Sequence, residues 1–169
     1  SSGAEPPMAL TYQGRDDRAI KQAYASLFLD RIAPLEARPG DGPPHVGIVV
    51  TNGHEGVFAR CLGGLVERLP TDRMKVTVAC SLAGRNVLSH MFFKRPMNYL
   101  VLSTRVDEAA AALSAARIDL LHYWEIGTDS TNYFLPFYRP APIQTTTWGW
   151  PTTTGNPRSE EHTSELQSQ

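Results

Sequence analysis

Apolar and polar positions along the chain follow two different periods. Continuous apolar runs of strand length, rich in β-branched residues, occur at 45–51, 75–81, 98–103 and 118–124, and a short polar strand rich in threonine is predicted at 143–149. Segments with apolar residues at helical spacing lie between them, at 57–66, 85–93, 104–117 and 129–138, and another at 16–32 precedes the first run. Uninterrupted apolar runs are typical of strands buried on both faces. The alternation predicts an α/β, Rossmann-like fold with a mostly parallel sheet.

Prolines and glycines mark the boundaries between these elements. The run PLEARPGDGPP at 34–44 separates the first helix from the first strand, which divides the chain into an N-terminal part, 1–44, and a lobe, 45–157. The residues SSGAEPPM at the N-terminus are small and polar and predict a frayed end. Thr104 and Asp107 form a pattern that resembles a capping box. The RPAP run at 139–142 excludes a helix and predicts direct entry into an inner strand at 143–149.

Composition and charge remove several classes of function. A chain of 169 residues is long enough for one domain with a core, and its formal net charge of −1 presents no basic surface for nucleic acid. Cys61 and Cys80 are too few and too far apart for a metal knuckle or a disulfide framework, so we expect reduced thiols and a cytoplasmic protein. There is neither an apolar run of about 18 residues nor a signal-peptide pattern, which predicts no membrane span.

The first candidate chemistry follows the first strand, in the sequence TNGHEG at 51–56. Asn52 and Gly53 permit an unusual turn, and His54 and Glu55 stand at the start of the next helix, where free backbone N–H groups favour an anion. A histidine titrates near neutrality, so His54 is a candidate acceptor of a proton from a hydroxyl. The alternative is that His54 only caps the helix or bonds a neighbouring loop. The sequence is not the GxGxxG fingerprint of a dinucleotide site.

The second candidate group follows the fourth strand, in HYWEIGTDST at 122–131. His122 lies within the apolar run and is interpreted as a satisfied core histidine. Glu125 and Asp129 come just after the strand, at the same sheet edge as His54, where they can bind sugar hydroxyls or cap the next helix; capping suits Asp129 better. The chain has no DxD pair and no GxSxG, P-loop or HExxH motif, so no metal-held diphosphate is expected.

The segment 118–155 resembles the N-terminal catalytic lobe of O-linked N-acetylglucosamine transferases, especially the bacterial and SPINDLY-like members. Residues 139–144 match the family's RPAPIQ in full, Gly149 and Pro151 match its Leu-Gly-Tyr-Pro loop, and Gly155 matches the end of that loop. At the end of the fourth strand the chain departs from the family, because Tyr123 replaces an aspartate and EIGT replaces N-G-Y/H-T. The resemblance covers about residues 12–157.

The resemblance implies one lobe of a GT-B glycosyltransferase, which transfers N-acetylglucosamine from UDP-GlcNAc to Ser or Thr hydroxyls with inversion and without a metal or other cofactor. His54 matches the family's active-site histidine, although Glu55 stands where proline is usual. Asn52, Gly53, Glu55, Glu125, Gly149 and Pro151 are expected to contact substrate. The expected partners are the sugar nucleotide, an acceptor protein, a C-terminal lobe after residue 157 and N-terminal helical repeats, so this chain alone is expected to have no turnover.

Two further expectations complete the sequence-based picture. Of the last twelve residues, RSEEHTSELQSQ at 158–169, the first eleven resemble the translated read-through of a sequencing adapter, so we expect a non-native tail; the alternative is a native polar tail. Glu160, Glu161 and His162 are then without a chemical role. The alternatives in function are a GT-B transferase with another sugar or acceptor, and a non-catalytic binding module on the same fold.

Overall fold

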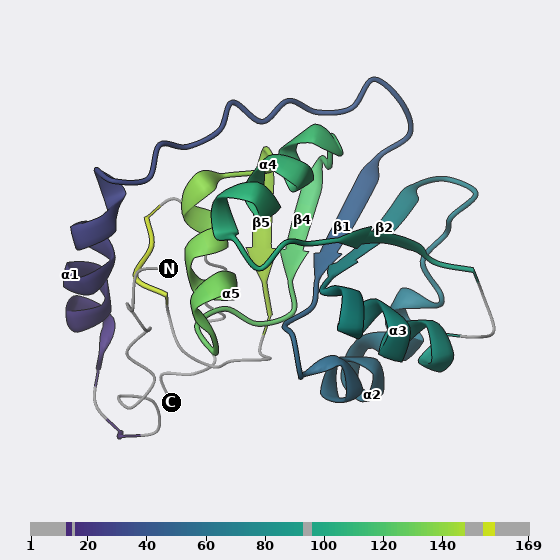
Figure 1. Cartoon of the computed structure of the whole chain (residues 1–169), viewed down its shortest axis with the longest axis horizontal. Helices are drawn as coiled ribbons and strands as arrows, with labels where there is room; N and C mark the ends of the chain where they lie inside the picture. The colour runs from purple at the N-terminus through teal and green to yellow at the C-terminus, as the bar shows by residue number, and fades with distance from the viewer. Residues whose placement is uncertain (1–12, 15, 93–95, 148–153, 158–169) are drawn as a thin grey trace.

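The computed structural model describes residues 13–14, 16–92, 96–147 and 154–157. Its centre is a parallel sheet of five strands in the order β3-β2-β1-β4-β5 (Figure 1). The strands are β1 (His45–Val49), β2 (Lys75–Cys80), β3 (Asn98–Val101), β4 (Leu120–Tyr123) and β5 (Ile143–Thr146). The predicted α/β, Rossmann-like sheet is therefore confirmed, and each strand begins within two residues of its predicted start.

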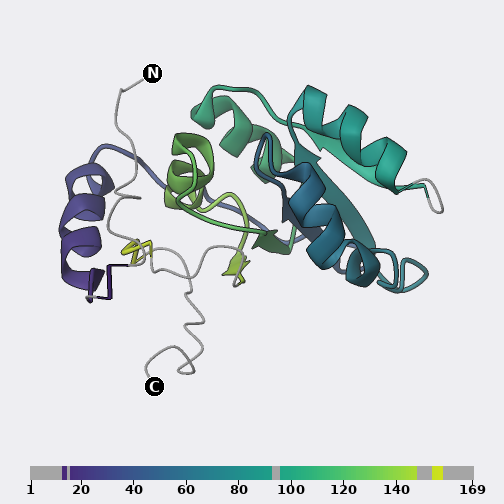
Figure 2. The same cartoon turned by 90° about the horizontal axis from the view of Figure 1, so that it is seen from below.

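The helices alternate with the strands. They are α1 (Arg18–Leu29), α2 (Glu55–Val66), α3 (Leu82–Met91), α4 (Val106–Ala115) and α5 (Ser130–Phe134), which continues into the 3₁₀ helix η2 (Leu135–Tyr138). Helices α2 and α3 cover one face of the sheet, and α4 with η2 covers the other. Figure 2 shows α1 at the opposite end of the molecule from α2 and α3.

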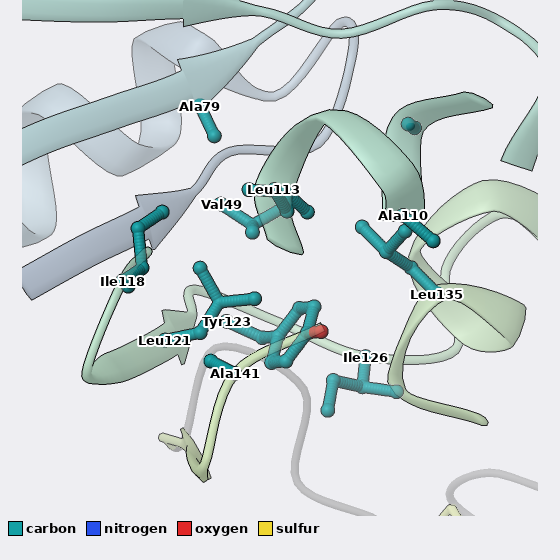
Figure 3. Packing of buried hydrophobic residues seen from close by; sticks show 11 residues of the cluster. Val49, Ala79, Ala110, Leu113, Ile118, Leu121, Tyr123, Ile126, Leu135 and Ala141 are labelled. Carbon is teal, nitrogen blue, oxygen red and sulfur yellow. The ribbon is translucent and has the colours of Figure 1, made fainter. Parts of the chain in front are cut away.

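Two apolar clusters bury the two faces of the sheet, as the continuous apolar runs predicted. Successive residues of a strand point to opposite faces, so Ile48 and Val50 pack toward α2 and α3 while Val49 packs toward α4. In β4, Leu121 and Tyr123 join the α4 face, where Figure 3 shows them among the other buried side chains. Such strands have no polar face because both sides are covered.

The RPAPIQ segment has a structural role in this lobe. Gln144 in β5 is buried; its side-chain oxygen accepts a hydrogen bond from the Tyr123 hydroxyl at 2.9 Å, and its Nε2 donates to the Pro136 carbonyl at 3.2 Å. Tyr123 is the last residue of β4. Its phenol is fully buried, and burial raises the pKa of the Tyr123 hydroxyl well above its ordinary value. The Tyr123 side chain therefore fills the core and binds β4 to β5.

Helix α1 docks through an aromatic cluster on the helical layer formed by α5 and η2. Tyr24 and Phe28 of α1 contact Tyr133 and Phe134, with ring centroids 5.8 Å and 4.8 Å apart. Gly155 lies against the backbone of α1 at Lys21, and the Tyr133 hydroxyl donates to the Thr154 carbonyl at 3.3 Å. The segment that follows β5 thus returns to the first helix of the chain.

Two local predictions were wrong. Strand β5 lies at the edge of the sheet within the described residues, because it pairs with β4 alone, so the prolines deliver an outer strand and not an inner one. Thr104 does not cap α4. The N-cap is Arg105, which has no side-chain cap bond, while the Ser103 hydroxyl accepts from the Arg105 N–H at 3.2 Å and donates to Glu108 at 2.6 Å.

Some predictions concern residues outside the described ranges. Gly149 and Pro151 lie there, as do residues 1–12 and the tail 158–169, so the predicted substrate loop, frayed terminus and adapter-derived tail stay predictions. None of the helices in the described part of the chain is both long and apolar enough to cross a membrane. Within the same residues, no group of three or more His, Cys, Asp or Glu side chains gathers to hold a metal ion.

Candidate functional site

The candidate site lies where β1 and β4 end. These neighbours are parallel, with Val49 opposite Tyr123, so the loops that follow them leave the same edge of the sheet. The β1–α2 loop leads to one face and the β4–α5 loop to the other. In doubly wound sheets, ligands bind in the crevice at this reversal of the strand order. The fold therefore brings His54 and Glu125, which are 71 residues apart in the sequence, to one place.

His54 and Glu125 form a hydrogen-bonded pair across this crevice. The bond joins His54 Nδ1 to Glu125 Oε1. The Glu125 side chain is 5% exposed, whereas that of His54 is 44% exposed. An ionised carboxylate only accepts hydrogen bonds, so toward it Nδ1 carries a proton, and in a neutral ring of this tautomer Nε2 keeps its lone pair. The arrangement fixes Nδ1 and leaves Nε2 of a half-exposed side chain as the ring nitrogen that can take a proton from a bound hydroxyl.

The β1–α2 loop holds His54 in this position. The Asn52 side-chain oxygen accepts from the Ser81 hydroxyl at 2.7 Å, and the Ser81 hydroxyl accepts from the Gly84 N–H at 3.0 Å as the N-cap of α3. Gly53 has φ +85°, a left-handed conformation that L side chains rarely adopt. The predicted unusual turn at Asn52–Gly53 is thus confirmed, and its effect is to place His54 at the first position before α2.

The two explanations for His54 can be compared directly. His54 occupies the N-cap position of α2, but its side chain makes no cap hydrogen bond. The ring instead bonds Glu125 of the neighbouring loop, as the alternative explanation expected. The side chain is nevertheless half-exposed, which a proton acceptor requires. Its catalytic role stays a prediction.

Glu55 and Glu125 were both expected to contact substrate, and both are buried. An alanine Cβ at Gly84 would lie 2.6 Å from Glu55 Oε1, so the Glu55 carboxylate occupies the space that this glycine leaves at the start of α3. Carboxylates are favourable near a helix N-terminus. This position favours a structural role for Glu55 between α2 and α3, and the position of Glu125 favours its pairing with His54. Substrate contact by either residue stays a prediction.

The two remaining polar residues of the fourth strand and its loop behave as the sequence indicated. His122 Nδ1 bonds the Thr145 hydroxyl at 2.9 Å, and burial holds the pKa of His122 below its ordinary value, as in a satisfied core histidine. Asp129 caps α5 by accepting from the Asn132 N–H at 2.8 Å. Both interpretations are confirmed.

A pocket of about 450 Å³ opens at the same edge of the sheet, where β1, β2 and β3 end, and neither His54 nor Glu125 is among its described lining residues. Its floor includes Val49 and Leu102, and its rim carries side-chain hydroxyls together with the Asp129 carboxylate. No lysine or arginine is among the described residues that line it. The described lining therefore offers side-chain hydroxyls, amides and one carboxylate as polar groups.

Sequence reasoning missed three residues whose side chains join the loops at this edge of the sheet. Thr51, Ser81 and Asn132 all bond across from one loop to another, and none was singled out. For Asn132 a signal existed: Asp129 and Asn132 have the three-residue spacing of a capping box, which the structure shows in full. For Thr51 and Ser81 there was none, since their partners depend on the strand order.

The fold resembles that of a known glycosyltransferase. No family model and no curated protein matches the chain. Among solved structures, a mutant of the O-GlcNAc transferase from Thermobaculum terrenum matches with a TM-score of 0.69 and 20% sequence identity. The match covers 90% of this chain and 31% of that one, so this chain spans less than a third of the enzyme's length. At this identity the likeness shows the fold alone: a Rossmann-like α/β unit of the kind found in that O-GlcNAc transferase.

Proposed function

We propose that this chain is part of a glycosyltransferase of the O-GlcNAc transferase type and carries the groups that act on the acceptor hydroxyl. The observation that carries the proposal is the His54–Glu125 pair at the carboxyl edge of the sheet. The fold and the RPAPIQ segment support it. The substrates would be UDP-GlcNAc and a Ser or Thr hydroxyl of an acceptor protein, and the compartment the cytoplasm.

The pair suits one step of this chemistry. His54 Nε2 takes the proton of the acceptor hydroxyl, whose oxygen forms a bond to C1 of the sugar while the bond between C1 and the phosphate oxygen breaks. The electron pair of that bond leaves with UDP, and the anomeric centre is inverted. The imidazolium that forms lies against the Glu125 carboxylate, which stabilises it and holds the ring in place.

The leaving diphosphate needs positive groups that the carboxyl-edge pocket does not offer among its described lining residues. We therefore expect the donor to be held by a second lobe of a longer protein. The 169-residue chain by itself should transfer no sugar, and transfer of labelled N-acetylglucosamine by this chain alone would contradict the division of roles.

The decisive test is His54→Asn in the protein encoded by the complete gene. The asparagine amide can still donate to Glu125 but has no lone pair in the place of Nε2. Transfer from UDP-GlcNAc to acceptor proteins should fall by about 10²–10⁴-fold, the usual contribution of a general base. The control is His90→Asn: His90 is exposed on α3, and among the described residues its ring bonds only the Asn86 carbonyl of its own helix, at 2.7 Å. The control should keep wild-type activity.

The same assay separates the alternatives. Unchanged transfer in His54→Asn would remove His54 from the mechanism, and absence of transfer in the wild type would favour a binding module. Competition by unlabelled sugar nucleotides identifies the donor: another sugar nucleotide that competes better than UDP-GlcNAc would point to a different transferase on this fold.

A further inference from the structure

We propose that Asn132 is a positioning residue whose side-chain amide ties the β4–α5 loop, which carries Glu125, to the β1–α2 loop, which carries His54. The inference rests on the proposed function for its consequence in catalysis, but the contact itself does not. Asn132 lies at the third position of α5, is 2% exposed, and touches neither His54 nor Glu125 through a hydrogen bond in the described structure.

The amide of Asn132 uses its full hydrogen-bonding capacity. Its oxygen accepts from the Gly127 N–H at 2.9 Å and from the Asp129 N–H at 3.3 Å. Its nitrogen donates to the Thr128 hydroxyl at 2.6 Å and to the Thr51 hydroxyl at 2.8 Å. Two acceptor sites and two donor hydrogens are all that a carboxamide has. A buried amide that is completely satisfied is held in one orientation, because any rotation leaves a buried polar group without a partner.

The identities of the partners also settle which end of the amide faces which loop. Backbone N–H groups only donate, so the end that faces Gly127 and Asp129 must be the oxygen. The nitrogen therefore faces the threonines, and both hydroxyls act as acceptors toward it. Three of the four bonds close the β4–α5 loop on itself between residues 127 and 129, immediately after Glu125.

The fourth bond, to Thr51, crosses the crevice. Thr51 is buried, two residues beyond the end of β1, and its carbonyl accepts the His54 N–H at 3.1 Å. A short path thus runs from Asn132 through Thr51 to the backbone of His54. The two loops are joined by side chains at two places, through Thr51 and Asn132 and through His54 and Glu125. The buried Thr51–Asn132 bond holds the two loops at the distance at which the His54–Glu125 bond can form.

Two isosteric substitutions separate this role from general stability. Thr51→Val and Thr128→Val each remove one hydroxyl acceptor from the same amide nitrogen, but only Thr51 lies on the opposite loop. The readout is the tautomer of the His54 ring in the 169-residue chain at pH 8, where an ordinary imidazole is neutral. Nitrogen-15 shifts of a ring labelled with ¹⁵N report it, and they require no enzymatic activity.

The wild type should hold His54 as the Nδ1–H tautomer that the carboxylate demands, and Thr128→Val should do the same. Thr51→Val should shift the ring toward the Nε2–H form that unpaired imidazole prefers, with a well-dispersed amide spectrum that shows an intact fold. In the complete enzyme, kcat of Thr51→Val should fall at least about tenfold with the KM for the donor unchanged, since orientation and not donor binding is lost.

Three results would overturn the proposal. Thr51→Val with the wild-type tautomer would show that the link does not position the pair. An equal shift in Thr128→Val would show that the closure of the β4–α5 loop on itself, and not the Thr51–Asn132 bond, sets the tautomer of His54. A wild type that is already in the Nε2–H form would remove the His54–Glu125 pair itself. The first two results would leave the proposed function untouched. The proposed function is tested separately, by the sugar-transfer assay with His54→Asn.

Discussion

The substitution Gly155→Ala tests how the end of the lobe is attached to α1. An alanine Cβ at this position would lie 2.4 Å from the carbonyl carbon of Lys21, 2.5 Å from the amide nitrogen of Gln22 and 2.6 Å from the Lys21 carbonyl oxygen. Real Cβ contacts essentially never fall below 3.0 Å, and these three atoms belong to a helix backbone, which has no rotamer through which to move away. One of the two segments must therefore shift.

The expected cost has two parts. Gly155 has φ +69°, and the left-handed conformation costs a residue with a Cβ about 1–2 kcal/mol. Forcing a methyl group into a packed contact costs about 1–3 kcal/mol more. The sum, about 2–5 kcal/mol, is a large share of the roughly 5–15 kcal/mol that stabilises a typical domain. Detachment of α1 is the cheaper response if its aromatic contacts with Tyr133 and Phe134 are worth less than the clash.

Urea unfolding followed by circular dichroism measures the global part of this cost, and hydrogen exchange of residues 18–29 measures detachment of α1. The control is Gly53→Ala: Gly53 also has a positive φ, +85°, but its Cβ would meet no atom within 4 Å. The control should lose only the conformational part, about 1–2 kcal/mol. If the two variants agree within about 0.5 kcal/mol and α1 exchanges as in the wild type, the close contact at Gly155 does not limit stability.

Three further results are expected. Burial holds the pKa values of His45 and His122 below the ordinary 6.5, so the unfolded chain binds more protons than the folded one as the pH falls through that value. The free energy of unfolding, measured by urea titration, should therefore decrease from pH 7 toward pH 5. In His122→Asn this dependence on pH should be weaker. Burial raises the pKa of the Cys80 thiol to about 11. Iodoacetamide at pH 8, followed by mass spectrometry, should therefore label the exposed Cys61 quickly and Cys80 only after unfolding. Rapid labelling of both cysteines would contradict the burial of β2. Asp129→Ala removes the cap of α5 and should cost about 1 kcal/mol in thermal unfolding, and an unchanged transition would show that the capping box is dispensable.

The sequence was most informative where one physical cause decided the outcome. Apolar runs without a polar period mark strands that are covered on both faces, as β1 and β2 are, and a strand was found at each of the five predicted segments. The same reasoning identified His122 as a core residue and Asp129 as a cap, because strand burial and helix starts are set by near neighbours. The surroundings of Glu125 depend on where the β1–α2 loop lies, because its partner His54 is 71 residues away in the sequence. The periodicity of the sequence does not contain the position of that loop.

The two wrong predictions have the same origin. Thr104 has the spacing of a capping residue, yet the helix begins after Arg105, where Ser103 and Glu108 satisfy the turn instead. The prolines before β5 exclude a helix, as expected, but whether a parallel strand lies inside a sheet or at its edge depends on what pairs with it on both sides. Local patterns define an element; they do not define its neighbours.

The sequence by itself determined the class of fold, the order of strands and helices along the chain, and the two loops in which polar residues follow buried strands. Those properties follow from local periodicity and from the cost of burying unpaired polar groups. The tertiary structure alone decided that β1 and β4 are adjacent, and hence that His54 meets Glu125 and Thr51 meets Asn132. Adjacency of strands is set by the packing of whole layers over long sequence separations, so the pairing of these side chains emerges only once the sheet is assembled.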